Sequence, residues 1–235
     1  MAISTNPLAW LRSVQPRRAI ALLLLLLPLT VGAQTVRDLW LSMPPSLAPY
    51  LSTSLRTQCL DFYDMHTDAQ TDNALKGKSR IDTLTSTFLA ATLSKAHTLQ
   101  MKLLPASGSG LGSSMVSVSS SSLSSCDSVL CVVRSWDGPK RDSEVQLFDR
   151  QWKPLQAPFT FSADSFVCRP DTMSEERFSR LVALLDPIMF SVSLSPAENV
   201  LLVKLSPVVP NPEDEKAIEQ ILVQRKLKWD GKTFK

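Results

Sequence analysis

The sequence predicts an α+β fold in which helices pack on one face of a mostly antiparallel meander sheet. Short runs of alternating apolar and polar residues are typical of half-buried antiparallel strands. These runs follow one another in groups instead of alternating singly with helices, which argues against a parallel α/β sheet. The 235 residues include 16 Pro and 7 Gly, which favours many short elements.

Residues 1–33 form a predicted signal peptide. A basic stretch ends at Arg18, and residues 19–31 form an apolar run of 13 with six consecutive leucines. That run is too short for a bilayer core, which takes about 20 residues. Small residues then end at Ala33, so we expect cleavage between Ala33 and Gln34. No cysteine follows the cleavage point, so a lipid anchor is not indicated.

Removal of this segment changes the charge of the protein. The full chain has 25 basic and 22 acidic residues, and residues 1–33 hold three arginines and no acid. Residues 34–235 therefore carry 22 groups of each sign. A neutral body lacks the broad basic field on which nucleic-acid binding normally rests. We expect an exported protein, periplasmic or secreted, with no nucleic-acid partner and no transmembrane segment in the mature chain.

Residues 34–155 are predicted to form a first unit of helices and strands. Thr35 and Asp38 resemble a capping box that opens a short helix. A second helix has its apolar residues on one face. Alternation of apolar and polar residues then predicts a meander of strands. In the third strand, one face is apolar and is expected to be buried, while the other face is polar. The helices are expected at 35–41 and 54–66, and the strands at 80–84, 88–93, 97–104, 129–136 and 144–149.

A serine-rich stretch interrupts the predicted strands. Residues 107–128 contain 12 Ser and 3 Gly among 22 positions. Few apolar side chains are present to offset the entropy of ordering such a segment. We therefore expect a flexible insertion between two strands.

Residues 156–235 repeat the helix-plus-strands pattern and are expected to be continuous with the first unit. Asp171 or Thr172 is predicted to cap a helix that Pro187 ends. Two strands, 188–194 and 199–205, and a helix that begins at Asn211-Pro212 follow. Asp230-Gly231 is a two-residue hairpin signal near the end of the chain.

Three tryptophans are candidates for a surface that binds a partner. Trp136, Trp152 and Trp229 all fall at predicted strand ends or turns, where secreted binding modules often present aromatic side chains. Packing in the core or at a sheet edge is the favoured alternative for each of them. They are the only residues that we single out for binding.

The histidines and acids give one candidate for chemistry. Asp61, Asp64, Asp68 and Asp72 are spaced to align on one helical face with His66 near the row. A solvated helix face is the favoured interpretation, because the spacing lacks the Gly turn and terminal Glu of a calcium loop. A hydrolase or metal-assisted enzyme that uses His66 with Asp64 or Asp68 remains the alternative function. No catalytic set, cofactor or metal site is otherwise indicated.

The four cysteines lie after residue 33. Cys59 is on the apolar face of a predicted helix and is interpreted as a small buried hydrophobic residue. Cys126 and Cys131 are too far apart along an extended strand to form a disulfide. Whether Cys126, Cys131 and Cys168 form disulfides after a turn of the chain stays open. The absence of a C-x-x-C pattern argues against a zinc site.

The chain also resembles a family of secreted proteins from Bacteroidetes, domain of unknown function 3256. The motifs that carry the resemblance cover essentially all of the chain after residue 33 and are structural. They are Asp38-Leu39-Trp40, Met43-Pro44, residues 47–51, 60–64 and 99–105, Gly138-Pro139, Asp142-Ser143, Phe148-Asp149, Trp152, Trp229, Gly231 and Phe234. The resemblance implies no catalytic residue. We expect a non-enzymatic binding or interaction module of the cell envelope, whose partner is a protein or another envelope component.

Overall fold

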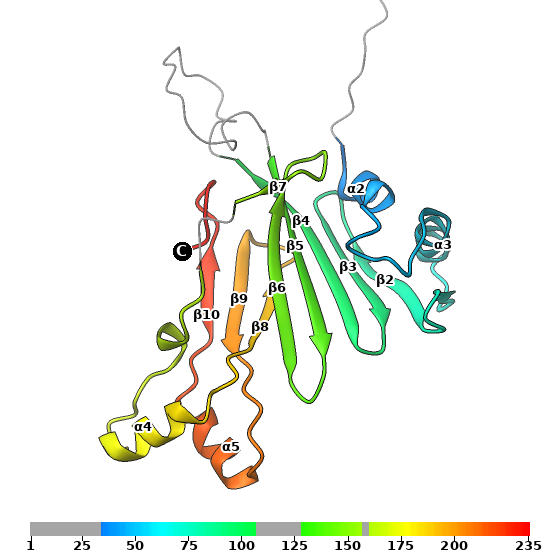
Figure 1. The fold of residues 1–235 in the computed structure, drawn as a ribbon. Coiled ribbons are helices and arrows are strands. Elements are labelled where there is room, and N and C mark those ends of the chain that lie inside the picture. Colours follow the sequence, from blue (N-terminus) through cyan, green and yellow to red (C-terminus); the bar gives the residue numbers. More distant parts are fainter. Residues whose placement is uncertain (1–33, 107–127, 157–159) are drawn as a thin grey trace, which may run out of the picture. The chain divides into compact units, whose positions relative to one another are not determined.

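The computed structural model describes residues 34–106, 128–156 and 160–235, and places residues 34–235 in one compact unit. The signal peptide and most of the serine-rich stretch lie outside the described residues, although Ser128 begins a strand. Within the described parts of the chain, no helix is long and apolar enough to cross a membrane. The α+β class and the antiparallel sheet are confirmed (Figure 1).

A seven-stranded antiparallel meander forms the centre of the fold. Its strands lie in sequence order, from β1 to β7. Both edge strands have only two residues, so β1 pairs with only two residues of β2 and β7 with only two residues of β6. The bounds are β1 Thr71–Asp72, β2 Lys78–Leu84, β3 Phe88–Ser94, β4 His97–Pro105, β5 Ser128–Asp137, β6 Arg141–Phe148 and β7 Pro154–Leu155.

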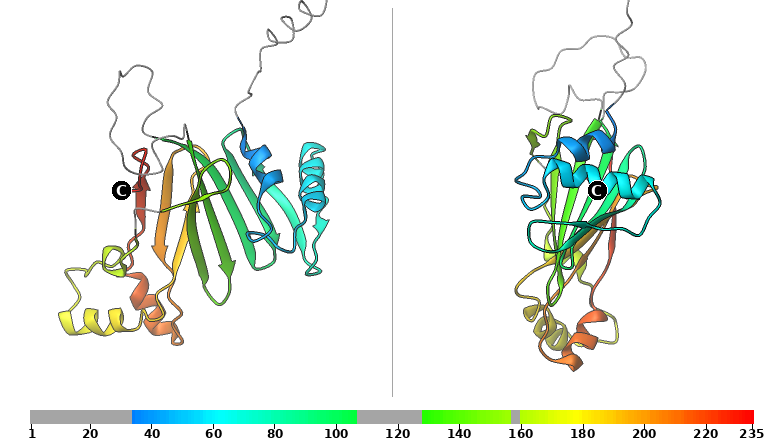
Figure 2. Two further views of the ribbon diagram at one scale, coloured as in Figure 1. Left: turned by 45° about the horizontal axis from the view of Figure 1, so that its top comes forward. Right: turned by 90° about the vertical axis from the view of Figure 1, so that its right-hand side faces the viewer.

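Two helices, α2 (Val36–Ser42) and α3 (Thr53–Asp64), cover one face of this sheet. The capping box of α2 is confirmed, because the Thr35 and Asp38 side chains each accept from the backbone N–H of the other residue. Trp40 is fully buried, and its Nε1–H donates to the Arg56 carbonyl at 3.0 Å. The apolar residues of β3, β4 and β5 that face these helices complete one core. Figure 2 shows both helices on the same side of the large sheet.

The other face of the large sheet is covered by a second, three-stranded sheet. Its order is β10–β9–β8, with bounds Phe190–Leu194 for β8, Val200–Leu205 for β9 and Arg225–Lys228 for β10. Cys131, Leu147, Val192 and Leu201 belong to the core between the two sheets. The C-terminal strands therefore do not extend the meander.

Strand β8 lies against β4, β5 and β6, and side chains of the large sheet satisfy its open edge. Gln100 Oε1 accepts from Leu194 N at 2.8 Å, and Ser143 Oγ accepts from Val192 N at 3.1 Å. Lys102 is 2% exposed, so the polar face predicted for the third strand is buried beneath β8. The polar residues that alternate along β4 therefore contact the second sheet instead of water.

The remaining helices lie in the segments that precede β8 and that join β9 to β10. Helices α4 (Glu175–Ala183) and α5 (Pro212–Glu219) contact each other, and the short 3-10 helix η2 (Ala163–Phe166) packs on β9. The start of α5 is confirmed, with Asn211 as its N-cap and Pro in the first turn.

Several predicted boundaries were wrong by a few residues, among them the start of β6, which is Arg141 and not residue 144. Three others have a clear structural reason. Helix α4 begins after Ser174, not after Asp171 or Thr172, because the Ser174 hydroxyl accepts from Arg177 N. Helix α3 ends at Asp64 instead of His66, which has a positive φ of 52°. In the C-terminal hairpin Trp229 pairs with Phe234, so the two turn residues are Gly231 and Lys232. Gly231 has a φ of 98°, a conformation that favours glycine.

Candidate functional site

An open, mostly apolar groove lies beside the β5–β6 hairpin. We call it the Trp136 groove; its volume is about 680 Å³. Three segments that are distant in the sequence line it: the β5–β6 hairpin, the connection from α4 to β8, and the connection from β9 to α5. The lining residues are Trp136, Gly138, Pro139, Lys140, Asp142, Ala183, Leu184, Asp186, Pro187, Met189, Val208 and Pro210.

Trp136 is 39% exposed and yet is held in place by its neighbours. It is directly opposite His97 in the β4–β5 ladder, and the two rings stack with their centroids 5.1 Å apart and an angle of 11° between their planes. The guanidinium carbon of Arg134 lies 5.4 Å from the Trp136 ring centroid. A stacked ring and a cation fix the orientation of the indole before any ligand arrives.

His97 supports Trp136 as a neutral, buried ring. Burial and then the charge of Arg134 lower the His97 pKa from 6.5 to about 4. The Tyr50 hydroxyl hydrogen-bonds to His97 Nδ1, and burial raises the Tyr50 pKa to about 12. Both groups therefore keep one protonation state near neutral pH. This pair suits the positioning of an aromatic ring better than proton transfer.

The charges on the groove are unbalanced. The lining holds two carboxylates, Asp142 and Asp186, and one ammonium group, that of Lys140. Lys140 is ion-paired with Glu215 of α5. Both aspartates are exposed, and within the described residues neither of them makes an ion pair. The groove is locally acidic on an otherwise neutral body.

A second cavity, of about 580 Å³, lies on the helix-covered face of the large sheet beside β6 and β7. Glu144 accepts from Arg134 Nη2 at 2.6 Å and from Gln146 Nε2 at 2.7 Å. Arg134 Nε and Gln146 Oε1 are buried and have no partner among the described residues. Because Glu144 neutralises the guanidinium, the cavity presents no net charge from this pair.

Trp152 and Trp229 are buried, in agreement with the packing role that the sequence favours. The Trp152 indole N–H donates to Ser42 Oγ at 3.2 Å, and its ring meets the edge of Phe148. The Trp229 indole N–H donates to the Pro105 carbonyl at 2.6 Å, and its ring packs on Phe234. Of the three candidate tryptophans, only Trp136 presents its ring at the surface.

In the candidate enzyme site, the Asp64 carboxylate is engaged by Arg37. Asp64 forms an ion pair with Arg37 at 2.5 Å, which lowers the pKa of the carboxyl group. His66 and Asp68 line a cavity of about 420 Å³ that does not include Asp64. The acidic row ends with α3, since Asp72 belongs to β1. In the described part of the chain, no cluster of three or more His, Cys, Asp or Glu residues is arranged to hold a metal ion.

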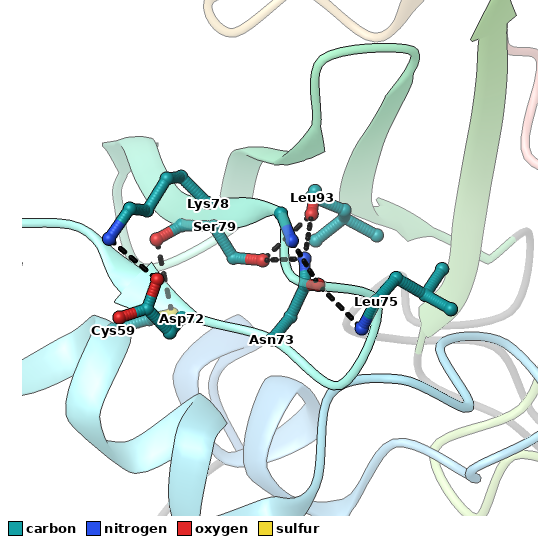
Figure 3. A network of polar contacts seen from close by, with 8 residues as sticks. Cys59, Asp72, Asn73, Leu75, Lys78, Ser79 and Leu93 are labelled. Carbon is teal, nitrogen blue, oxygen red and sulfur yellow. Dashed lines mark hydrogen bonds and ion pairs between the residues drawn. The ribbon is translucent and has the colours of Figure 1, made fainter.

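A buried polar network at the β1–β2 hairpin has a structural role (Figure 3). Asn73 Nδ2 donates to Ser79 Oγ at 3.0 Å and to the Leu93 carbonyl at 2.8 Å. Asn73 Oδ1 accepts from the backbone N–H groups of Leu75 and Gly77, both at 3.0 Å. Both heteroatoms of the Asn73 amide therefore have partners within the chain, and the network holds the β1–β2 hairpin on β3.

The cysteines are not paired with one another among the described residues. Cys59 is 2% exposed, so its interpretation as a buried hydrophobic residue is confirmed. Cys131 is fully buried in the core between the sheets, and burial raises the pKa of its thiol. Cys168 is exposed and free, and Cys126 lies outside the described residues.

Comparison with known proteins places this fold in a family. The model of a family described as "Protein of unknown function (DUF3256)" matches residues 28–234. The chain belongs to this family. The resemblance seen in the sequence is thereby confirmed, and no function comes with it. No curated protein matches this chain.

Solved structures with a similar fold include one from a bacterium. It is a domain of an uncharacterised protein from Porphyromonas gingivalis W83, with a TM-score of 0.64 and 22% sequence identity. The match covers 85% of this chain and 98% of that domain. At this identity the likeness shows the fold alone.

The sequence offered little that would reveal the groove. Trp136 was a candidate, but Pro187, Met189, Val208 and Pro210 belong to connections whose place in the fold depends on the second sheet. The clearest available signal is the presence of proline in all three lining segments, because proline-rich connections often mark chain that leaves a sheet.

Proposed function

We propose that this protein is an exported, non-enzymatic binding module of the cell envelope, and that the Trp136 groove is the surface that contacts its partner. The observation that carries the proposal is a partly exposed tryptophan whose ring is already oriented by His97 and Arg134. Aromatic residues held rigidly beside an apolar hollow are typical anchors of protein interfaces.

The neighbourhood of Trp136 adds exposed apolar surface. Ile188 is 53% exposed and stands between Pro187 and Met189, two residues that line the groove. Contiguous exposed apolar surface is uncommon on a protein that acts alone and often marks a contact site. The partner is a protein or another envelope component.

Export rests on the sequence of residues 1–33. Loss of this segment would leave the start of the fold intact, because Thr35 and Asp38 cap α2 from residues that remain. The expected mature chain starts at Gln34 and is periplasmic or secreted. Mass spectrometry of the protein recovered from its producing cells tests this directly: a mass that retains residues 1–33 would contradict export by a cleaved signal peptide.

Site-specific photo-crosslinking tests the binding surface. A benzophenone amino acid replaces Ile188 in one variant and Leu75 in a second, which is 67% exposed and outside the groove residues. We expect irradiation of producing cells to give a discrete covalent adduct from position 188 and none from position 75. Equal adducts from both positions, or none from position 188, would contradict the proposal.

The enzyme alternative uses His66 with Asp64 or Asp68. It is less well supported, because Asp64 is engaged by Arg37 and does not line the cavity that contains His66. A His66→Ala variant, compared with the unmodified protein for bound metal and for hydrolysis of a broad substrate panel, separates the two functions. A loss of metal or activity in this variant would refute the binding-only function.

A further inference from the structure

We propose that the Trp136 groove binds a peptide segment of a partner protein in which an apolar side chain stands beside a lysine or arginine. This inference rests on the proposed function and adds the chemistry of the ligand. It is carried by two independent features of the groove, its apolar lining and its uncompensated carboxylates.

The lining selects an apolar side chain. Only three of its twelve residues, Lys140, Asp142 and Asp186, have charged or hydrogen-bonding side chains besides the Trp136 indole. A sugar or nucleotide would need more polar partners than these to replace the water it loses. A volume of about 680 Å³ accommodates a large aliphatic or aromatic side chain together with its neighbours along a peptide.

The carboxylates select the charge beside it. Asp142 and Asp186 lie on different segments of the lining and have no cationic partner within the described residues, whereas Lys140 already pairs with Glu215. Asp142 Oδ1 accepts from the backbone N–H groups of Ser143 at 3.0 Å and Phe190 at 3.4 Å, which leaves the charge of the carboxylate without a cation. An approaching cation therefore meets two carboxylates that no described cation neutralises, and an ammonium group that is already paired. The same charges disfavour an anionic lipid surface, which would be repelled.

The probes are three biotinylated nine-residue peptides with a benzophenone residue at one end. The first has a central leucine between two lysines, the second has glutamates in place of the lysines, and the third has serine in place of the leucine. Each peptide is mixed with the protein recovered from its producing cells and is then irradiated. Mass spectrometry then gives the yield of adduct and the residues that carry it.

We expect the lysine–leucine peptide to label the groove segments, and each of the other two peptides to give at most about a tenth of its yield. Asp142→Asn and Asp186→Asn should each lower that yield about two- to fivefold, the range for an exposed ion pair. Asp164→Asn is the matched control, because this exposed aspartate of η2 is outside the groove. Its yield should not change.

The inference is overturned if the glutamate peptide labels the groove as well as the lysine peptide does, if labelling falls outside the groove, or if the Asp142 and Asp186 variants behave like the Asp164 control. Failure here combined with a cellular adduct at position 188 would reject the ligand class and leave the proposed function standing. Failure of both experiments would reject both. The aspartate variants keep Trp136 and its packing, so loss of folding does not confuse their result.

Discussion

The two ends of the long strands β4 and β5 have different surroundings. At one end Trp229 is buried against Phe234 and bonded to Pro105, and the Lys102 ammonium group donates to three carbonyls of the β8–β9 turn. At the other end Trp136 is exposed and two aspartates lack cationic partners within the described residues. The first end joins the sheets, whereas the second is available for binding.

The largest effect on stability is expected at the closed end. Trp229→Ala removes a buried indole and the hydrogen bond to the Pro105 carbonyl. We expect the free energy of unfolding to fall by about 3–5 kcal/mol, as for other buried tryptophans. Chemical denaturation measures the change. A loss below about 1 kcal/mol would mean that the two ends do not differ in the way described.

The next effect concerns Lys102, whose Nζ lies 2.6 Å from the Ser195 carbonyl, 3.0 Å from that of Pro196 and 2.8 Å from that of Glu198. Lys102→Met keeps the apolar stem but removes all three donors. We expect a loss of about 2–3 kcal/mol, because hydrogen bonds from a charged group are lost and the carbonyls need new partners. Hydrogen exchange should show faster opening of β8. Unchanged exchange in β8 would show that Lys102 does not fasten the sheets.

A smaller, pH-dependent effect is expected at the open end. The pKa of His97 is about 4 in the folded protein and ordinarily 6.5, so the unfolded chain binds a proton first as the pH falls. The contribution of neutral His97 is complete above pH 6.5 and is lost between pH 6.5 and about 4. We expect it to be on the order of 2 kcal/mol.

His97→Gln is the variant that isolates this contribution. The fall in unfolding free energy between pH 6.5 and 5 should be smaller in the variant than in the unmodified protein. Identical slopes in the two proteins would show that His97 is not held neutral by its burial beneath Trp136.

Local elements were predictable from the sequence because their signals are local. The capping box of α2, the Asn211-Pro212 start of α5 and the alternation in β4 all depend on residues a few positions apart. The second sheet was not foreseen, since alternation does not say what covers the polar face. Gln100 and Lys102 fit the pattern of a solvent-facing strand face. In the structure Gln100 accepts a hydrogen bond from β8, and Lys102 donates to the turn after β8.

The candidate site was predictable only in part. A tryptophan at a strand end carries no sign of its burial, so Trp136, Trp152 and Trp229 looked alike in the sequence. What distinguishes them is tertiary: Pro105 and Ser42 provide acceptors for two of the indoles, while the third stacks on His97. The groove itself unites segments some 70 residues apart, with no periodic pattern that links them.

Trp136→Ala separates binding from stability when both are measured on the same variant. We expect the free energy of unfolding to fall by about 1–2 kcal/mol, less than for Trp229→Ala because the ring is partly exposed, together with loss of the photo-adduct from position 188. A stability loss as large as that of Trp229→Ala, or an adduct yield that stays the same, would contradict this expectation.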